Sequence, residues 1–175
     1  MHAIRIGAVM VVFGALFAAA RADEPKPKDG PATAPAVVQA DGSLLLTPLG
    51  ARIHGSKLRV EQKPTPVIVN WIDPNENVEW PKAVAKKGKY EVEITYSCPP
   101  NAGGEFVVAA AAAKITGRTE NTGNWQTFRT VKVGTFTVLN DQTPVALRST
   151  GNFNHLLMNV RSVKLTPVPE EKPKK

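Results

Sequence analysis

The sequence predicts an all-β protein, an antiparallel β-sandwich or jelly roll, and three observations lead to this prediction. Residues 88–98 alternate strictly between an apolar face that includes Tyr90 and Val92 and a polar face that includes Glu91 and Glu93. This period of two is typical of a half-buried strand. Turn residues recur at short intervals along the chain, and no long amphipathic helix pattern is found, which is the spacing expected of a sandwich.

The N-terminus has the pattern of a secretory signal peptide over residues 1–22. A basic start that ends at Arg5 is followed by an apolar run, residues 6–20, and by the small-residue tripeptide Ala-Arg-Ala. The apolar run is too short and wrongly flanked for a membrane span. We therefore expect an exported protein, periplasmic or extracellular, without a membrane span.

The rest of the chain divides into a linker, one domain and a tail. Residues 23–41 are rich in Pro, Lys and Ala and predict a linker, and the charged residues 168–175 predict a disordered tail, because neither segment has a core to bury. Residues 42–167 form the predicted β-sandwich domain, which is long enough for such a core.

The first part of the domain reads as short strands separated by turns. Residues 43–60 predict two or three strands around Gly50 and Gly55. The apolar triplet at 67–69 follows prolines that oppose a helix. The cluster at residues 73–77 predicts a turn, because Pro fixes its own φ while Asp and Asn side chains bond the nearby backbone. A short strand-like run, Val-Glu-Trp, comes next.

Residues 106–114, FVVAAAAAK, are ambiguous in the sequence. The alanines favour a helix by intrinsic propensity. The segment is short, however, and lies between an Asn-Ala-Gly-Gly turn and an Ile-Thr-Gly sequence, in a chain of short alternating strands. We therefore expect a strand here.

The last part of the domain continues the strand pattern. Alternating strands are expected over residues 128–138, then from Val145 to a close at Gly151, and finally over residues 156–165. The apolar phase of this last strand changes shortly after Val160, which predicts a β-bulge.

The chain has a formal net charge of +7 and a single cysteine, Cys98. One cysteine cannot form an internal disulfide, and its position on an apolar strand face predicts a partly buried, inert thiol. For an exported protein the positive charge indicates a solvated basic surface, or an affinity for anionic glycans. No nucleic-acid partner is expected.

The sequence contains no set of side chains typical of catalysis, so we expect a protein that is not an enzyme. The motifs HExxH, CxxC and GxSxG are absent. Asp73, Glu76 and Glu79 are close enough in sequence for a carboxylate pair of the kind that hydrolyses glycosides. A turn aspartate and solvated strand residues are the better interpretation of these three.

Two tryptophans beside Asn- and Gly-rich turns predict a sugar-binding site. Trp71 and Trp125 each lie at a strand edge. The apolar C–H faces of sugars stack on flat aromatic rings, and asparagine amides pair with hydroxyl groups. The alternative is that these tryptophans are core residues, since tryptophan is highly buried on average. Trp80 fits the core interpretation best.

Two segments of the domain resemble the family 6 carbohydrate-binding modules, which belong to the galactose-binding-like β-sandwiches. Residues 69–96 contain NWIDPNENVEWP and GKYEVEITY, similar to the family's aromatic-Ile-Asp turn, its Val-Glu-aromatic strand and its Gly-x-Tyr strand. Residues 122–165 contain TGNWQTF and LMNVRSVKL, similar to the Thr-Gly-x-Trp-x-Thr-aromatic motif and the closing apolar-Asn-apolar strand. The chain is also similar to modules appended to exported bacterial sulfatases and fucosidases.

The resemblance implies a sugar cleft at the loop end of the sandwich. It places Trp71 on one wall, Trp125 on the opposing wall, and Asn159 where an asparagine bonds the sugar hydroxyls. Three further residues are secondary candidates for ligand contacts: Asp73, Asn154 and Arg161.

The chain departs from the family where the family holds a structural calcium ion, so no cofactor or metal is predicted, and calcium stays open only as the less favoured alternative. The family's early Glu-Ala-Glu segment has no clear match before Arg59, and Arg161 stands where the closing strand often has Asp. A guanidinium at Arg161 would form a structural ion pair or prefer an acidic sugar, and the ion pair is the favoured interpretation.

These observations lead to two hypotheses of different classes. The first is an exported, non-catalytic module that binds a poly- or oligosaccharide between two loop tryptophans. The second is a structural or protein-interaction sandwich that docks onto another exported enzyme or envelope component without binding sugar, which buried tryptophans and an exposed apolar patch would favour. An exported glycoside hydrolase or sulfatase is the expected protein partner. A glycosidase or lyase is a distant third hypothesis, because it would need Asp73 and Glu79, or another pair, to converge in a cleft.

Overall fold

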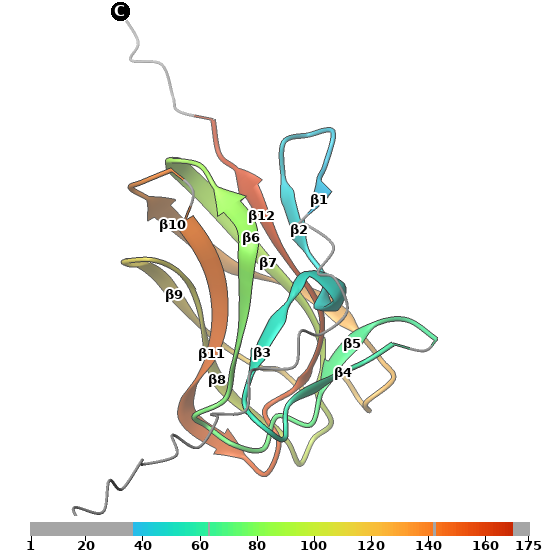
Figure 1. Ribbon diagram of the computed structural model, residues 1–175. Coiled ribbons are helices and arrows are strands. Elements are labelled where there is room, and N and C mark those ends of the chain that lie inside the picture. The colour runs from blue at the N-terminus through green and yellow to red at the C-terminus, as the bar shows by residue number, and fades with distance from the viewer. Residues whose placement is uncertain (1–36, 63, 142, 170–175) are drawn as a thin grey trace, which may run out of the picture. The chain divides into compact units, whose positions relative to one another are not determined.

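The computed structural model describes residues 37–62, 64–141 and 143–169, which form a sandwich of two antiparallel β-sheets (Figure 1). The predicted signal peptide, most of the linker and most of the tail lie outside the described residues. The helical structure of the described part is one 3-10 turn, η1 (Pro48–Gly50), and no helix there is long and apolar enough to cross a membrane. The all-β sandwich that the sequence predicts is confirmed.

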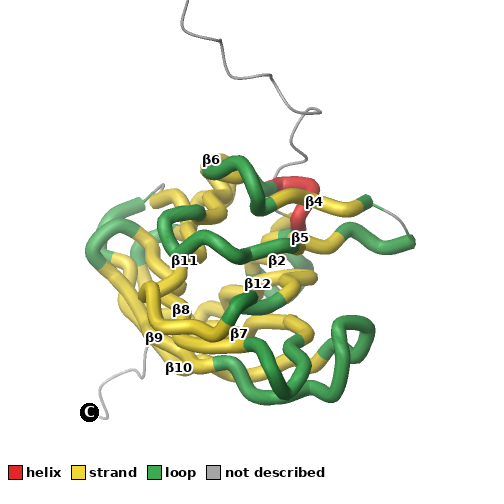
Figure 2. The backbone as a smooth tube through the Cα atoms, turned by 90° about the horizontal axis from the view of Figure 1, so that it is seen from below, coloured by secondary structure: helices red, strands yellow, loops and turns green. Residues whose placement is uncertain are grey.

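The larger sheet has seven strands and is organised around its C-terminal strand. Its strands are β1 (Val37–Val38), β2 (Leu44–Leu46), β4 (Arg59–Glu61), β5 (Val67–Val69), β7 (Gly88–Ser97), β10 (Arg129–Val138) and β12 (Asn159–Pro167). One edge of β12 pairs with β7, which in turn pairs with β10. The other edge pairs with both β2 and β5, which carry β1 and β4 respectively. In Figure 2 β5 and β2 lie together beside β12.

The smaller sheet has five strands in the order β3-β6-β11-β8-β9. Its strands are β3 (Arg52–His54), β6 (Asn77–Ala85), β8 (Gly103–Ala110), β9 (Ala113–Arg118) and β11 (Thr143–Asn154). β6 follows the predicted turn, in which Glu76 N–H donates to the Asp73 carbonyl at 3.3 Å.

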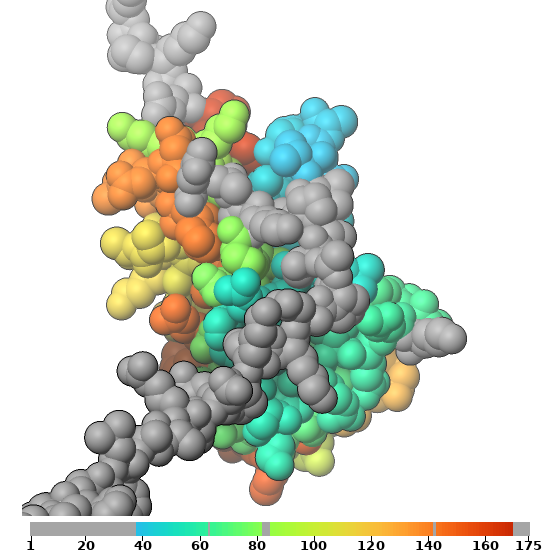
Figure 3. All heavy atoms as spheres, viewed as in Figure 1, coloured from blue at the N-terminus to red at the C-terminus, as the bar shows by residue number. Residues whose placement is uncertain are grey.

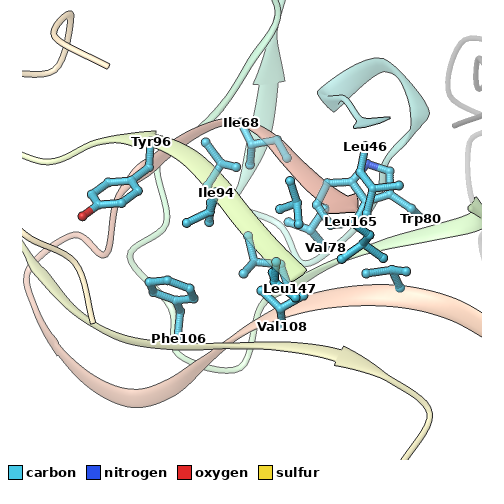
Figure 4. Close-up of a cluster of buried hydrophobic side chains, with 14 of the residues drawn as sticks. Leu46, Ile68, Val78, Trp80, Ile94, Tyr96, Phe106, Val108, Leu147 and Leu165 are labelled. Atoms are coloured by element: carbon cyan, nitrogen blue, oxygen red, sulfur yellow. The ribbon is translucent and has the colours of Figure 1, made fainter. Parts of the chain in front are cut away.

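The core fills the space between the sheets with the apolar faces of alternating strands. Figure 4 shows that side chains from both sheets interleave, each less than 2% exposed: Leu46, Ile68, Val78, Trp80, Ile94, Tyr96, Phe106, Val108, Leu147 and Leu165. On β7, Val92 and Ile94 are fully buried while Glu91 and Glu93 are partly exposed, as the alternation predicts.

The alanine run forms a hairpin, whereas the sequence analysis expected one strand. β8 ends at Ala110, Ala111 and Ala112 form the turn, and β9 begins at Ala113, which pairs with Ala110. Ala111 has φ of 52°, a left-handed conformation that alanine rarely adopts. The turn was not evident from the sequence because alanine has no turn preference.

Two strand boundaries also differ from the sequence analysis. β1 pairs with β2 inside the stretch that the sequence predicts as linker, so the sheet begins before residue 42. β11 continues past Gly151 to Asn154, because a register shift between Ser149 and Phe153 accommodates the glycine without ending the strand.

A buried carboxylate, Glu76, fixes the connection between β3 and β4. Its oxygens accept the backbone N–H groups of Ser56, Lys57 and Leu58 at 2.6, 2.6 and 2.8 Å, and the residue is only 4% exposed. A Cβ at Gly55 would overlap the Glu76 side chain, so the connection needs glycine there. Glu76 is therefore a structural anchor for the start of β4, and not the solvated residue expected from the sequence.

We expect Glu76→Gln to lower the free energy of unfolding by about 2–4 kcal/mol, because an amide cannot replace a carboxylate that accepts three buried N–H groups. Urea denaturation measures the change. Glu79→Gln is the matched control, since Glu79 is partly exposed and pairs with His54 at 3.0 Å; its loss should stay below about 1 kcal/mol. Equal losses in the two variants would contradict the anchoring role of Glu76.

Candidate functional site

A cleft of about 600 Å³ opens on the outer face of the seven-stranded sheet. Three parts of the chain line it: the β4–β5 hairpin, the loop between β9 and β10, and residues 156–161, which lead into β12 and begin it. The lining residues are Arg59, Glu61, Pro64, Thr65, Val67, Val69, Asn70, Trp125, Gln126, Phe128, Leu156, Asn159 and Arg161. In Figure 3 the green atoms of the β4–β5 hairpin project outward, with light-orange atoms of the β9–β10 loop at their edge.

The β4–β5 hairpin supplies one wall of the cleft by simple strand alternation. Ile68 is fully buried in the core, so its neighbours Val67 and Val69 point to the opposite face. Arg59 and Glu61 are paired with these two valines in the ladder and share their face. The two charged side chains form an ion pair at 3.0 Å and are each more than half exposed. This wall is therefore apolar near the sheet and charged at the rim.

The loop at residues 119–128 supplies the opposing wall, and the end of β7 holds it in place. The Glu120 backbone N–H donates to the Tyr96 hydroxyl at 2.7 Å, and the Ser97 hydroxyl donates to the Trp125 carbonyl at 2.8 Å. Trp125 remains partly exposed and lines the cleft. Hydrogen bonds to β7 therefore set the position of Trp125.

Cys98, the residue that follows β7, forms a third attachment to this loop through Thr122. The Cys98 N–H donates to the Thr122 hydroxyl at 2.9 Å, and the Thr122 N–H donates to the Cys98 carbonyl at 2.7 Å. The Asn124 side chain then accepts the backbone N–H groups of Gln126 and Thr127 at 2.8 and 2.9 Å, which closes the turn around Trp125. The loop is held at both of these points before any ligand arrives.

The bulge on β12 brings two polar side chains to the base of the cleft. The pairing of β12 with β7 shifts register between Val160 and Ser162, so the predicted bulge is confirmed and Arg161 is the extra residue. Val160 is fully buried, while Asn159 and Arg161 on either side of it line the cleft. Trp125 and Asn159, which come from distant segments, thus meet in one site.

Arg161 stacks on an aromatic ring, and the ion pair that the sequence analysis favoured for it is not formed. Its Cζ lies 3.7 Å from the centroid of the Phe128 ring. None of the ion pairs among the described residues involves Arg161. On the neighbouring strand β7, Glu91 pairs with Lys132 at 3.0 Å.

Trp71 lies in the core, which differs from the wall position that the sequence analysis gave it. The residue is 0% exposed, and its Nε1 is buried without a hydrogen-bond partner among the described residues. The reason is Asn70, whose φ of 65° breaks the alternation after β5 and turns the next side chain inward. The Trp71 carbonyl accepts the Leu157 N–H at 3.0 Å, so Trp71 supports the segment that leads to Asn159.

The other sequence candidates lie outside the cleft lining. Asp73 accepts the Asn75 N–H at 2.9 Å in a local turn, and Asn154 ends β11 opposite Gly103. Trp80 is a core residue, as predicted, and its Nε1–H donates to the Thr47 carbonyl at 2.8 Å. The described residues contain no group of three His, Cys, Asp or Glu side chains that could hold a metal ion.

The cleft combines four chemical features that the sequence analysis had only partly identified. Trp125 and the two valines present apolar surface, Asn159 presents an amide, Arg161 presents a stacked cation, and the rim carries an ion pair. The contribution of the β4–β5 hairpin to the cleft was missed, although the alternation of Arg59 and Glu61 with Val60 was a signal for a strand with a polar face. Its place beside Trp125 is set by tertiary structure and has no local signal.

Comparisons with known proteins establish the fold. No protein-family model matches the chain, and no curated protein matches its sequence. Among solved structures, a family 35 carbohydrate-binding module from Clostridium thermocellum aligns with a TM-score of 0.58 at 12% identity, over 72% of this chain and 98% of the module. The C-terminal family 6 module of a laminarinase from Zobellia galactanivorans aligns with a TM-score of 0.57 at 17% identity, over 71% and 98%.

A third similar structure carries a ligand. A family 6 module of lichenase 5A from Cellvibrio mixtus, in complex with cellotriose, aligns with a TM-score of 0.56 at 16% identity, over 71% of this chain and 97% of the module. The chain therefore has the fold of the family 6 and family 35 carbohydrate-binding modules, as the resemblance implied. At these sequence identities, the similarity shows a shared fold only.

Two of the residues that attach the β9–β10 loop, Tyr96 and Cys98, predict that the folded protein is less stable at alkaline pH. Burial raises the pKa of the Cys98 thiol and of the Tyr96 phenol above their ordinary values. The folded state therefore keeps protons that the unfolded chain releases, so the stabilisation is present below the unfolded pKa values and is lost as pH rises. We expect the free energy of unfolding to fall above about pH 8.5 through Cys98, and to fall further above about pH 10 through Tyr96.

Urea denaturation across this pH range measures the effect, and Tyr96→Phe/Cys98→Ala should flatten the curve. A wild-type stability that stays constant from about pH 8 to pH 11, or a double variant with the same slope as wild type, would contradict the burial of these groups.

Proposed function

We propose that this protein is a non-catalytic carbohydrate-binding module whose ligand lies in the cleft between the β4–β5 hairpin and the loop at residues 119–128. One observation carries the proposal: Trp125 and Asn159 line the same cleft although they are far apart in sequence. An indole face suits the apolar side of a sugar ring, and an amide suits its hydroxyls. The solved structures of the same fold, one of them with cellotriose, support this proposal.

In this account the sugar ring stacks on Trp125 and faces the valine wall, Val67 and Val69, instead of a second tryptophan. The volume of about 600 Å³ accommodates an oligosaccharide of a few units rather than a single atom or ion. Because hydrogen bonds already fix the loop, binding needs little ordering of the protein, which favours affinity for a flexible sugar chain.

The carboxylates of the described residues support a binding role rather than glycoside hydrolysis. Glu61 lines the cleft and pairs with Arg59, whereas Glu76 holds backbone amides and Glu79 pairs with His54. Hydrolysis needs two carboxyl groups facing the same glycosidic bond. No second carboxylate lines the cleft within the described part of the chain, which agrees with a site that binds without cleaving.

We also propose that the protein is exported and that an exported enzyme is its partner. The signal-peptide pattern of residues 1–22 would carry the module out of the cytoplasm, where polysaccharides are accessible. One structure of this fold is a mannanase that contains a family 35 module, at a TM-score of 0.50 and 12% identity. An exported glycoside hydrolase or sulfatase is accordingly the partner that we propose.

A docking role without sugar binding is less well supported. Trp71 and Trp80 are buried, which favours that hypothesis. The large exposed apolar residues of the described part, however, come from separate elements rather than one strand face: Val38, Leu49, Ile72 and Leu139. A docking patch is normally contiguous.

We expect Trp125→Ala to weaken binding to the best-bound oligosaccharide at least about tenfold, because the stacking surface is removed. The measurement is a glycan-array screen of residues 23–175 that includes neutral, uronate and sulfated sugars, followed by calorimetric titration of the best ligand.

The matched control is Trp71→Phe, which alters a tryptophan that the structure buries. This variant should lose stability through the cavity it leaves, yet keep its affinity within about threefold. Wild-type affinity in a folded Trp125→Ala, or equal losses of affinity in the two variants, would contradict the proposed cleft. A folded wild-type protein that binds no sugar on the array would overturn the function itself.

A further inference from the structure

Arg161 is the cleft's one cation without an acidic partner among the described residues. The other lining cation, Arg59, is neutralised by Glu61 at 3.0 Å. Arg161 takes part in no ion pair of the described residues, and its Nε is buried without a hydrogen-bond partner there. The base of the cleft therefore carries a net positive charge.

The guanidinium of Arg161 is held in a defined orientation. Its Cζ lies 3.7 Å from the Phe128 ring centroid, so one face of the planar group is covered by the ring. The bulge between Val160 and Ser162 directs the side chain to the outer face of the sheet. A stacked arginine loses little further freedom when its edge binds a planar anion, and a carboxylate matches that edge with two parallel hydrogen bonds.

We infer that the cleft is specific for an acidic saccharide, whose uronate carboxylate or sulfate ester binds the Arg161 guanidinium while the sugar ring stacks on Trp125. This inference rests on the proposed function, because it names the ligand class of the same site. The residues that line the cleft explain the preference: a neutral sugar would leave the Arg161 charge in a partly desolvated position without a counterion. The chain's net charge, +7 before the two arginines of the predicted signal peptide, Arg5 and Arg21, are removed, would also favour the approach of a polyanion.

Glu61 sets a second condition on the ligand. Its carboxylate lies on the rim of the same cleft and would repel an anion that approached that side. The acidic group therefore enters on the β12 side, next to Phe128 and Arg161, and the neutral part of the saccharide extends toward the hairpin. Removal of the Glu61 charge should strengthen the binding of acidic ligands.

The first test uses the wild-type protein and pairs of ligands that differ only in charge. One pair is an oligogalacturonate and its carboxyl-reduced form, and the other is a sulfated galactan oligosaccharide and its desulfated form. Calorimetric titration should give at least about tenfold tighter binding to the acidic member of one pair, and that preference should shrink when NaCl is raised from about 0.05 M to 0.5 M. The pair that shows the preference identifies the carboxylate or the sulfate ester as the anionic group.

The second test uses three charge variants, each checked for folding by thermal denaturation. Arg161→Gln should remove the preference for the acidic member over the neutral member, whereas Glu61→Gln should strengthen acidic binding severalfold. Arg129→Gln is the matched control, because Arg129 is exposed, pairs with Glu120 at 3.5 Å and lies outside the cleft lining. It should behave as wild type.

The outcomes separate this inference from the proposed function. Equal affinities for the acidic and neutral members of both pairs would overturn the acidic specificity and leave a neutral-sugar module. A preference that Arg161→Gln and Arg129→Gln reduce equally would also overturn it, since the general surface charge would then be responsible. Absence of binding to every member by the folded wild type would overturn the proposed function together with the inference.

Discussion

The attachment of one loop to the end of one strand is the constraint on which the site depends. Three consecutive residues of the chain, Tyr96, Ser97 and Cys98, hydrogen-bond to points along the loop at residues 119–128. Buried N–H groups must find acceptors, and here the loop satisfies the Cys98 N–H while the Tyr96 hydroxyl satisfies a loop amide. The same bonds that stabilise the fold therefore fix Trp125 at the cleft.

The rest of the cleft depends on the pairing of one edge of β12 with two different strands. β12 pairs with both β2 and β5, and β5 carries β4. The short β4–β5 hairpin therefore lies across the cleft from the loop at residues 119–128. The bulge at Arg161 then adds a residue on the outer face without disturbing Val160 and Val163 in the core. β12 thus supplies apolar side chains to the core, and the Asn159 amide and the Arg161 cation to the cleft on the surface.

Much of this fold could be predicted from the sequence, because strand alternation and turn residues are local signals. The bulge after Val160 was found in this way, whereas the convergence of Trp125 with Asn159 was implied by the resemblance to the family 6 modules. Trp71 was misplaced because a single left-handed residue, Asn70, reverses the alternation. The Phe128–Arg161 stack joins distant segments, so its formation depended on tertiary structure alone.

The central claim is that ligand binds beside Trp125 and away from the two buried tryptophans. The most direct measurement is a two-dimensional ¹H–¹⁵N NMR titration that follows the three indole N–H signals while an oligosaccharide ligand is added. The account predicts a saturable shift of the Trp125 signal, with the Trp71 and Trp80 signals nearly unchanged. Largest shifts at Trp71 or Trp80, with Trp125 unmoved, would contradict it.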